Sequence, residues 1–159
     1  MTASEYDRPA SARDALSPGL LLDVFLLLLL PVLALAPRIR EGETALAWTR
    51  YYAAQGAAAK RPGVHVRQAA HWAAQALELV APLPGGAEAA RLALNLGLAA
   101  EPRDRAAALT LYTEVRAVLE RLRTSRWRGA GLGGLAVEAA RLAEAAREPE
   151  TEKDDVEGR

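Results

Sequence analysis

Hydrophobic residues follow two different patterns along this chain. From Leu20 to Ala36 they are nearly continuous, with Asp23 as the one polar residue. From Thr44 to Arg147 they recur every three or four residues, in segments separated by proline and glycine. The first pattern is typical of a segment surrounded by lipid, and the second of amphipathic helices that bury one face. We therefore expect an apolar helix followed by a helical domain.

The apolar run has three interpretations. As a helix its seventeen residues reach ~25 Å, just short of a ~30 Å hydrocarbon core. We favour a membrane-spanning helix, in which Asp23 lies at the N-terminal end within reach of the headgroups and Pro31 is tolerated. A cleaved signal peptide is an alternative, because residues 34–36 (Ala-Leu-Ala) resemble a cleavage site, although Pro37 would follow the cut. A buried core helix is disfavoured, because the run has no polar stripe.

The polar segments and breakers divide the rest of the chain. We predict a disordered leader over 1–19, the membrane helix over 20–36, a charged linker over 37–43 after Pro37 ends the helix, and a disordered acidic tail over 148–159. Between linker and tail, breakers divide residues 44–147 into five helices. The first four span Thr44–Ala59, Val64–Val80, Ala87–Ala100 and Arg103–Arg123, and the fifth ends near Arg147.

Three of these helices carry the same apolar series, at positions i, i+3, i+4, i+7, i+10, i+11 and i+14. Such a series forms one stripe along a helix, and we expect that stripe to be buried. The third helix has few polar residues, so we expect it at the centre of the domain. The stripes are Val66, Ala69, Ala70, Ala73, Ala76, Leu77 and Val80; Ala108, Leu111, Tyr112, Val115, Val118, Leu119 and Leu122; and Leu132, Leu135, Ala136, Ala139, Leu142, Ala143 and Ala146.

The first four helices form two similar pairs. Gly56 and Gly97 fall near the end of the first helix of each pair, where a small residue lets two helices approach closely. The residues that the two pairs share resemble a known repeat family. Tyr52, Gly56, Ala69, Trp72, Ala76, Leu77 and Pro82, then Leu96, Gly97, Ala108, Tyr112 and Val115, resemble two tetratricopeptide (TPR) repeats, over roughly residues 44–123.

The resemblance implies a TPR-like domain of two helical hairpins, with the fifth helix in the place of a capping helix. It also implies a scaffold that binds other proteins, often through a concave face. The offset between the two pairs is 40 to 42 residues, longer than the ~34 of the family. The resemblance carries over no ligand residues.

Composition agrees with an all-α fold. Ala and Leu together number 62, whereas the β-branched Val, Ile and Thr number 17, and the former favour helices. The formal net charge is zero, so we expect no nucleic-acid partner.

Few residues of this chain suit catalysis or metal binding. There is no cysteine, which excludes thiolate chemistry and cysteine-bound zinc. His65 and His71 are six residues apart on one predicted helix, unlike the i, i+4 pair that shares a metal. We predict no cofactor, no metal and no enzymatic activity.

Arginine asymmetry around the apolar run indicates an orientation. Arg38 and Arg40 follow the run immediately and Arg50 lies further on, whereas Arg8 and Arg13 precede it. The positive-inside rule then places the C-terminal domain in the cytoplasm of a single-pass membrane protein.

Three groups of residues are candidates for binding. We expect a partner protein on the aromatic residues Trp48, Tyr51, Tyr52 and Trp72, which core packing explains equally well. We expect anionic membrane lipid or an acidic partner on Arg116, Arg121, Arg123, Arg126 and Arg128, which also suit the end of a helix. Asp23 is an intramembrane polar residue that a neighbouring subunit would pair.

These features favour a membrane-anchored scaffold that mediates protein–protein interaction at the membrane surface. An accessory single-span subunit of a membrane complex is one alternative. An exported soluble binding protein, released by cleavage after Ala36, is another.

Overall fold

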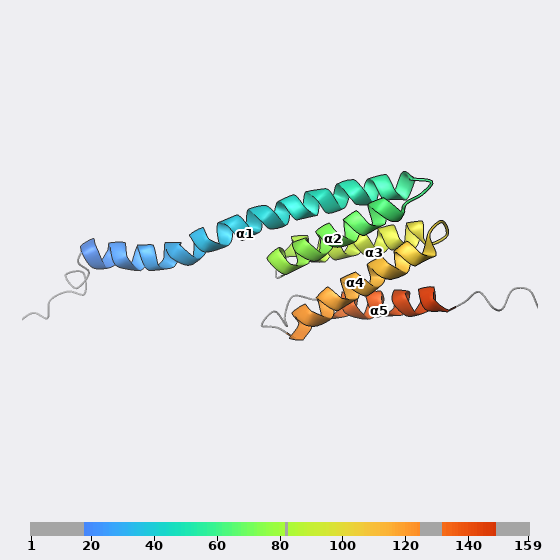
Figure 1. The fold of residues 1–159 in the computed structure, drawn as a ribbon. Helices are drawn as coiled ribbons and strands as arrows, with labels where there is room; N and C mark the ends of the chain where they lie inside the picture. The colour runs from blue at the N-terminus through green and yellow to red at the C-terminus, as the bar shows by residue number, and fades with distance from the viewer. Residues whose placement is uncertain (1–17, 82, 125–131, 149–159) are drawn as a thin grey trace, which may run out of the picture. The chain divides into compact units, whose positions relative to one another are not determined.

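The computed structural model describes residues 18–81, 83–124 and 132–148, and this part of the chain is helical without any strand. The all-α prediction is confirmed. Most of the predicted leader and tail lie outside the described residues, as does Pro82. Figure 1 shows the five helices, which are α1 Pro18–Ala58, α2 Gly63–Val80, α3 Pro84–Ala100, α4 Arg105–Thr124 and α5 Leu132–Arg147.

The chain divides into two compact units, residues 1–37 and 38–159. In the first unit, the described residues are the N-terminal part of α1. Their side chains are exposed apart from the half-buried Leu29. Among the described residues, α1 is the one helix that is long and apolar enough to cross a membrane, and a signal sequence has the same properties.

The predicted linker over 37–43 is helical, which corrects the expectation that Pro37 ends the helix. Both Pro31 and Pro37 lie inside α1. Proline removes one backbone hydrogen bond, but its fixed φ is compatible with a helix. Thr44 does not cap a new helix, since its Oγ1 donates to the Arg40 carbonyl 3.0 Å away. That bond to the residue four positions earlier is typical of a threonine within a helix.

The second unit contains the core, and the predicted stripes are its main component. All residues of the three stripes are buried except Leu135, which is half-buried against the core. In the part of α1 that belongs to this unit, Thr49 is fully buried, whereas Trp48 is exposed. A hydroxyl is tolerated in the core because Thr49 Oγ1 donates to the Ala45 carbonyl at 2.8 Å.

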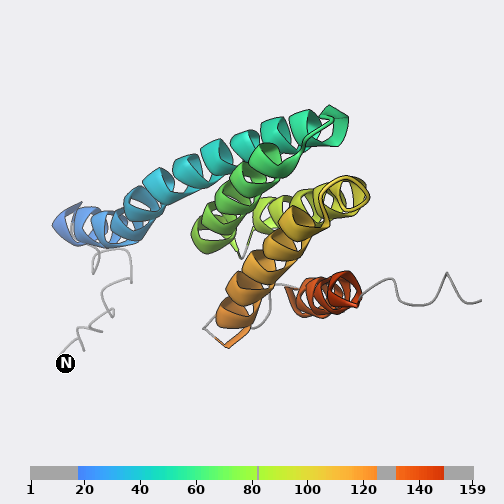
Figure 2. The same ribbon diagram turned by 45° about the vertical axis from the view of Figure 1, so that its right-hand side comes forward.

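Helices of the second unit pack against more than their immediate neighbours in the chain. Figures 1 and 2 show α2, α3, α4 and α5 reversing direction at each connection. Contacts join α2 to α3 and α4, α3 to α4 and α5, and α4 to α5. Leu96 of α3 also meets Gly56 of α1. Because α3 contacts the other four helices, the third helix is central as predicted.

Glycine permits two of these close approaches, as the sequence indicates. A Cβ on Gly56 would lie 2.8 Å from Cδ1 of Leu96, and a Cβ on Gly97 would overlap the ring of Tyr112. More than half of the buried apolar residues are alanine, so the helices elsewhere meet through small side chains too. The pairing of α3 with α4 therefore depends on the missing side chain of Gly97.

Gly97→Ala tests this dependence. The added methyl group must displace the buried Tyr112 ring, and overpacking of this kind costs about 1–3 kcal/mol. Gly134 provides the matched control, because a Cβ there meets nothing within 4 Å. We expect urea unfolding of the full chain in detergent micelles to show destabilisation for Gly97→Ala and none for Gly134→Ala. Equal stability of the two variants would contradict the close approach.

Tyr112 also carries the main buried polar group of this contact. Its ring is fully buried, and its O–H donates to Oε2 of Glu101 at 3.1 Å. Burial, followed by the charge and hydrogen bond of Glu101, raises the pKa of Tyr112 well above its ordinary value of 10.0. The folded chain therefore retains a phenolic proton that the unfolded chain releases at alkaline pH.

The consequence is a loss of stability in alkali. Below pH 10 the phenol is protonated in both states, whereas above it the unfolded state alone loses the proton. The unfolding free energy then falls with rising pH, by about 1.4 kcal/mol per pH unit for one proton. Unfolding curves between pH 9 and 11 should show a shallower alkaline decline for Tyr112→Phe than for the parent chain. Parallel declines would show that Tyr112 does not contribute.

Candidate partner-binding surface

The four aromatic residues predicted to bind a partner lie together in the second unit. Trp48, Tyr51 and Tyr52 are spaced i, i+3 and i+4 on α1, which places them on adjacent positions of one helix surface. Trp72 lies on α2. We refer to these four residues as the aromatic cluster.

Ring contacts connect the whole cluster. Trp48 stacks on Trp72 with ring centroids 5.9 Å apart and on Tyr52 at the same separation, and meets Tyr51 edge-on at 5.8 Å. The rings of Tyr51 and Tyr52 are also edge-to-face, at 5.2 Å. Such pairs contribute about 0.5–1.5 kcal/mol beyond burial. The cluster is therefore a continuous, preformed surface.

Exposure separates the four residues into two roles. Tyr52 and Trp72 are half-buried and pack against the core. Trp48 and Tyr51 are 42% and 52% exposed. Core packing accounts for the first two residues, whereas it leaves much of the other two in contact with water. Large aromatic side chains of this kind, resting on a rigid base, are typical of binding hot spots.

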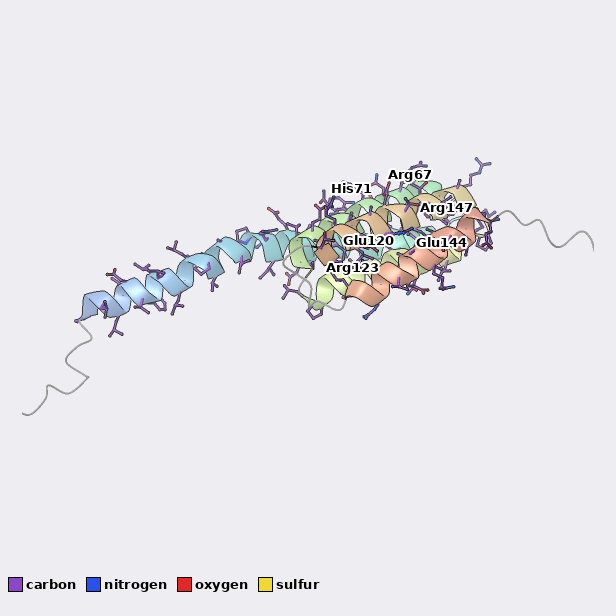
Figure 3. All side chains as sticks on the ribbon, turned by 90° about the horizontal axis from the view of Figure 1, so that it is seen from below. Arg67, His71, Glu120, Arg123, Glu144 and Arg147 are labelled. Atoms are coloured by element: carbon purple, nitrogen blue, oxygen red, sulfur yellow. The ribbon has the colours of Figure 1, made fainter. Side chains whose placement is uncertain are left out.

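Both histidines border the aromatic cluster. The ring of His71 meets Trp72 edge-on at 5.3 Å, and that of His65 lies 6.3 Å from Tyr52. His71 projects from α2 near Arg67 (Figure 3), and its Nε2 is 3.3 Å from Nε2 of Gln75. Nδ1 of His65 is buried without a hydrogen-bond partner among the described residues. The two rings extend the aromatic cluster at its edges.

The predicted arginine group is only partly described, because Arg126 and Arg128 lie outside the described residues. Arg121 forms an ion pair with Glu78 of α2. Arg123 pairs with Glu120 on the same face of α4 at 3.3 Å (Figure 3). Arg116 is half-buried. Acidic residues thus lower the local positive charge, although exposed pairs of this kind are weak. Asp23 is exposed near the start of α1.

A pair of arginines that the sequence did not single out occupies the corner between α3 and α4. Arg103 donates to the carbonyls of Ala57 and Ala59 at the end of α1 and of Ala99 in α3. Arg105 donates to carbonyls at the end of α5, those of Ala145, Ala146 and Glu148. Helix ends leave such carbonyls unpaired, and a positive charge there favours the helix dipole.

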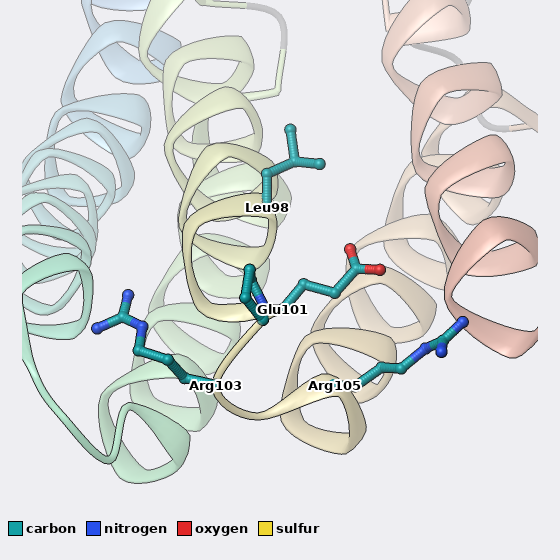
Figure 4. Close-up of a pocket in the computed structure, with 5 residues that line it drawn as sticks. Leu98, Glu101, Arg103 and Arg105 are labelled. Atoms are coloured by element: carbon teal, nitrogen blue, oxygen red, sulfur yellow. The ribbon is translucent and has the colours of Figure 1, made fainter. Parts of the chain in front are cut away.

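These arginines line a pocket of about 490 Å³ together with Leu98, Glu101 and Pro102. Figure 4 shows Arg103 and Arg105 directed to opposite sides of the corner. Because both guanidinium groups already bind backbone carbonyls, the pocket is a structural junction. Sequence pattern does not reveal it, since all the partners except Ala99 lie 40 or more residues away and all are backbone atoms.

No protein-family model, curated protein or solved structure matches the chain. Within the described residues, no three His, Cys, Asp or Glu side chains group closely enough to hold a metal ion. Within the same residues, the aromatic cluster exposes two large aromatic side chains, Trp48 and Tyr51.

Proposed function

We propose that this chain is a membrane-anchored, TPR-like scaffold that holds a partner protein at the membrane surface through the aromatic cluster. The observation that carries the proposal is the exposure of Trp48 and Tyr51, on a rigid base, in a domain that directly follows an apolar helix. The chain acts by binding, and we assign it no enzymatic activity.

The packing of the second unit supports the TPR-like interpretation. In an array of helical hairpins, each hairpin packs against its neighbours in the chain. The contacts of α2 with α3 and α4, and of α5 with α3 and α4, agree with that arrangement. Gly56 approaches Cβ of His65 in α2, and Gly97 approaches Tyr112 in α4, so each glycine permits a close contact within its own pair; Gly56 also contacts Leu96 of α3. In this interpretation α1–α2 and α3–α4 are the hairpins and α5 is the cap.

A protein suits the aromatic cluster better than lipid does. Trp48 follows Pro37 by eleven residues, which is ~16 Å along a helix. The headgroup region beyond the hydrocarbon core is ~5–8 Å thick on each side. The distance along the helix from Pro37 to Trp48 therefore exceeds the thickness of the layer in which membrane aromatic belts occur. Exposed Trp and Tyr at that distance are suited to a partner that is itself at the membrane surface.

Site-specific photocrosslinking tests the proposal. A photoreactive phenylalanine analogue in place of Tyr51, in the full chain in its native membrane, should form one discrete adduct with a protein. Trp48→Ala in the same chain should weaken that adduct, because it removes the ring on which Tyr51 and Tyr52 pack. The same analogue in place of Val137 is the control, since Val137 is 65% exposed on α5. The same adduct from both positions, or none from position 51, would contradict the proposal.

The proposal also predicts that the sequence of the membrane-spanning segment can be replaced without loss of partner binding. If α1 acts as an anchor, an unrelated apolar helix in place of residues 20–36 should preserve the adduct at position 51. Loss of the adduct would instead favour the accessory-subunit alternative, in which Asp23 pairs with a basic group of a neighbouring subunit. Loss of membrane retention with an N-terminus after Ala36 would indicate a signal peptide.

We place the second unit on the cytoplasmic side, because Arg38 and Arg40 directly follow the apolar segment. The absence of cysteine from the chain allows a clean test with the single substitution Val137→Cys. A membrane-impermeant maleimide should label this variant in opened cells and leave it unlabelled in intact cells. Labelling in intact cells would reverse the orientation.

A further inference from the structure

An apolar groove lies at the corner between α2 and α3, beside the beginning of the second unit. Its volume is about 330 Å³, and its lining includes Ile39, Leu46, Val80, Leu83, Pro84 and Gly85. At its rim, Ile39 and Leu83 are 37% and 40% exposed. Two large aliphatic side chains of the lining thus meet water, and nothing in the proposed partner interaction covers them.

Close contacts hold this corner against α1. A Cβ on Gly42 would overlap the side chain of Val80, and one on Gly85 would lie 3.4 Å from Cδ2 of Leu46. A Cβ on Gly86 would lie 2.7 Å from the backbone oxygen of Val80. The corner is therefore fixed within the second unit at the level of residues 39–46.

Residues 39–46 lie close to the apolar segment along the chain. Ile39 follows Pro37 by two residues, which is ~3 Å along a helix. The apolar segment of seventeen residues is ~25 Å long as a helix, about 5 Å shorter than a ~30 Å hydrocarbon core. About three more residues span that difference. If all three follow the C-terminal end of the segment, the hydrocarbon core ends at Ile39. Arg38 can extend its side chain toward the headgroups. The next ~5–8 Å of interface then reaches residues 42–44.

We infer that the α2–α3 corner inserts its apolar rim, Ile39 and Leu83, into the interfacial layer of the bilayer. This inference rests on the proposed membrane anchor and adds a second point of attachment to it. The ligand is the phospholipid interface itself. With two attachments, the second unit is held in one orientation on the membrane instead of swinging about a single tether.

The local charge indicates which lipids the corner accepts. Between residues 38 and 46, Arg38 and Arg40 are balanced by Glu41 and Glu43. Glu88, which also lines the groove, is paired with Arg50 at 2.6 Å. Because the net charge is near zero, attachment is driven by apolar burial. It therefore requires no anionic lipid, in contrast to the interaction predicted for the arginines of α4.

Depth-dependent fluorescence quenching tests the inference. A single Leu83→Cys substitution in the full chain, labelled with an environment-sensitive dye, is reconstituted in phosphatidylcholine vesicles that contain a headgroup nitroxide lipid. Leu98→Cys is the matched control, because Leu98 is 46% exposed toward the opposite end of α3. Leu27→Cys, within the apolar segment, tests the membrane anchor, through quenching by a nitroxide placed deep in the acyl chains. We expect quenching at position 83 several times that at position 98, and unchanged quenching at high salt.

Each outcome decides a different question. Quenching at position 27 by a deep acyl-chain nitroxide, without headgroup quenching at position 83, overturns the inference and leaves the anchor intact. Absence of quenching at position 27 overturns the anchor and the inference together. Quenching at position 83 that requires anionic lipid overturns the apolar mechanism. Circular dichroism of each labelled variant establishes that the helices are retained, and Ile39→Cys serves as the second rim position.

Discussion

Close approach of helix backbones is the constraint on which this fold depends. Just over half of the buried apolar residues are alanine, and glycine lies at the tightest positions. Small side chains bury little area each, so stability requires that the helices of the second unit pack at short separations. That requirement explains why Gly97 and Tyr112 are complementary, because the buried ring lies against a residue without a side chain. Trp48 and Tyr51 lie outside the core, where they are available to another molecule.

The two ends of the second unit have different chemistry as a result. Near the chain's entrance from the apolar segment, the α2–α3 corner presents aliphatic side chains around a groove. At the α3–α4 corner, Arg103 and Arg105 bind helix-end carbonyls. The aromatic cluster belongs to the length of α1 and α2 and not to either corner.

Periodicity predicted much of this fold, because apolar spacing reports directly which face of a helix is buried. The stripes of α2, α4 and α5 follow from spacing, and so does the grouping of Trp48, Tyr51 and Tyr52. Other features depend on tertiary context. Thr49 is buried because its hydroxyl bonds within its own helix, and α1 continues through Pro37 because one missing hydrogen bond does not stop it. Trp72 joins the aromatic cluster because α1 packs beside α2. Periodicity within each helix does not predict how two helices align. Arg103 and Arg105 bind backbone atoms, which leave no pattern in the sequence.

The junction at Arg103 and Arg105 has a consequence for how the domain comes apart. Linear arrays of helices ordinarily fray from their terminal members, since each contacts its neighbours alone. Here the α3–α4 corner binds the last carbonyls of α1 through Arg103 and the last carbonyls of α5 through Arg105. Separating the end of α1 or of α5 from the domain must break hydrogen bonds at the α3–α4 corner. The α3–α4 corner therefore couples the opening of the C-terminal end of α1 to the opening of α5.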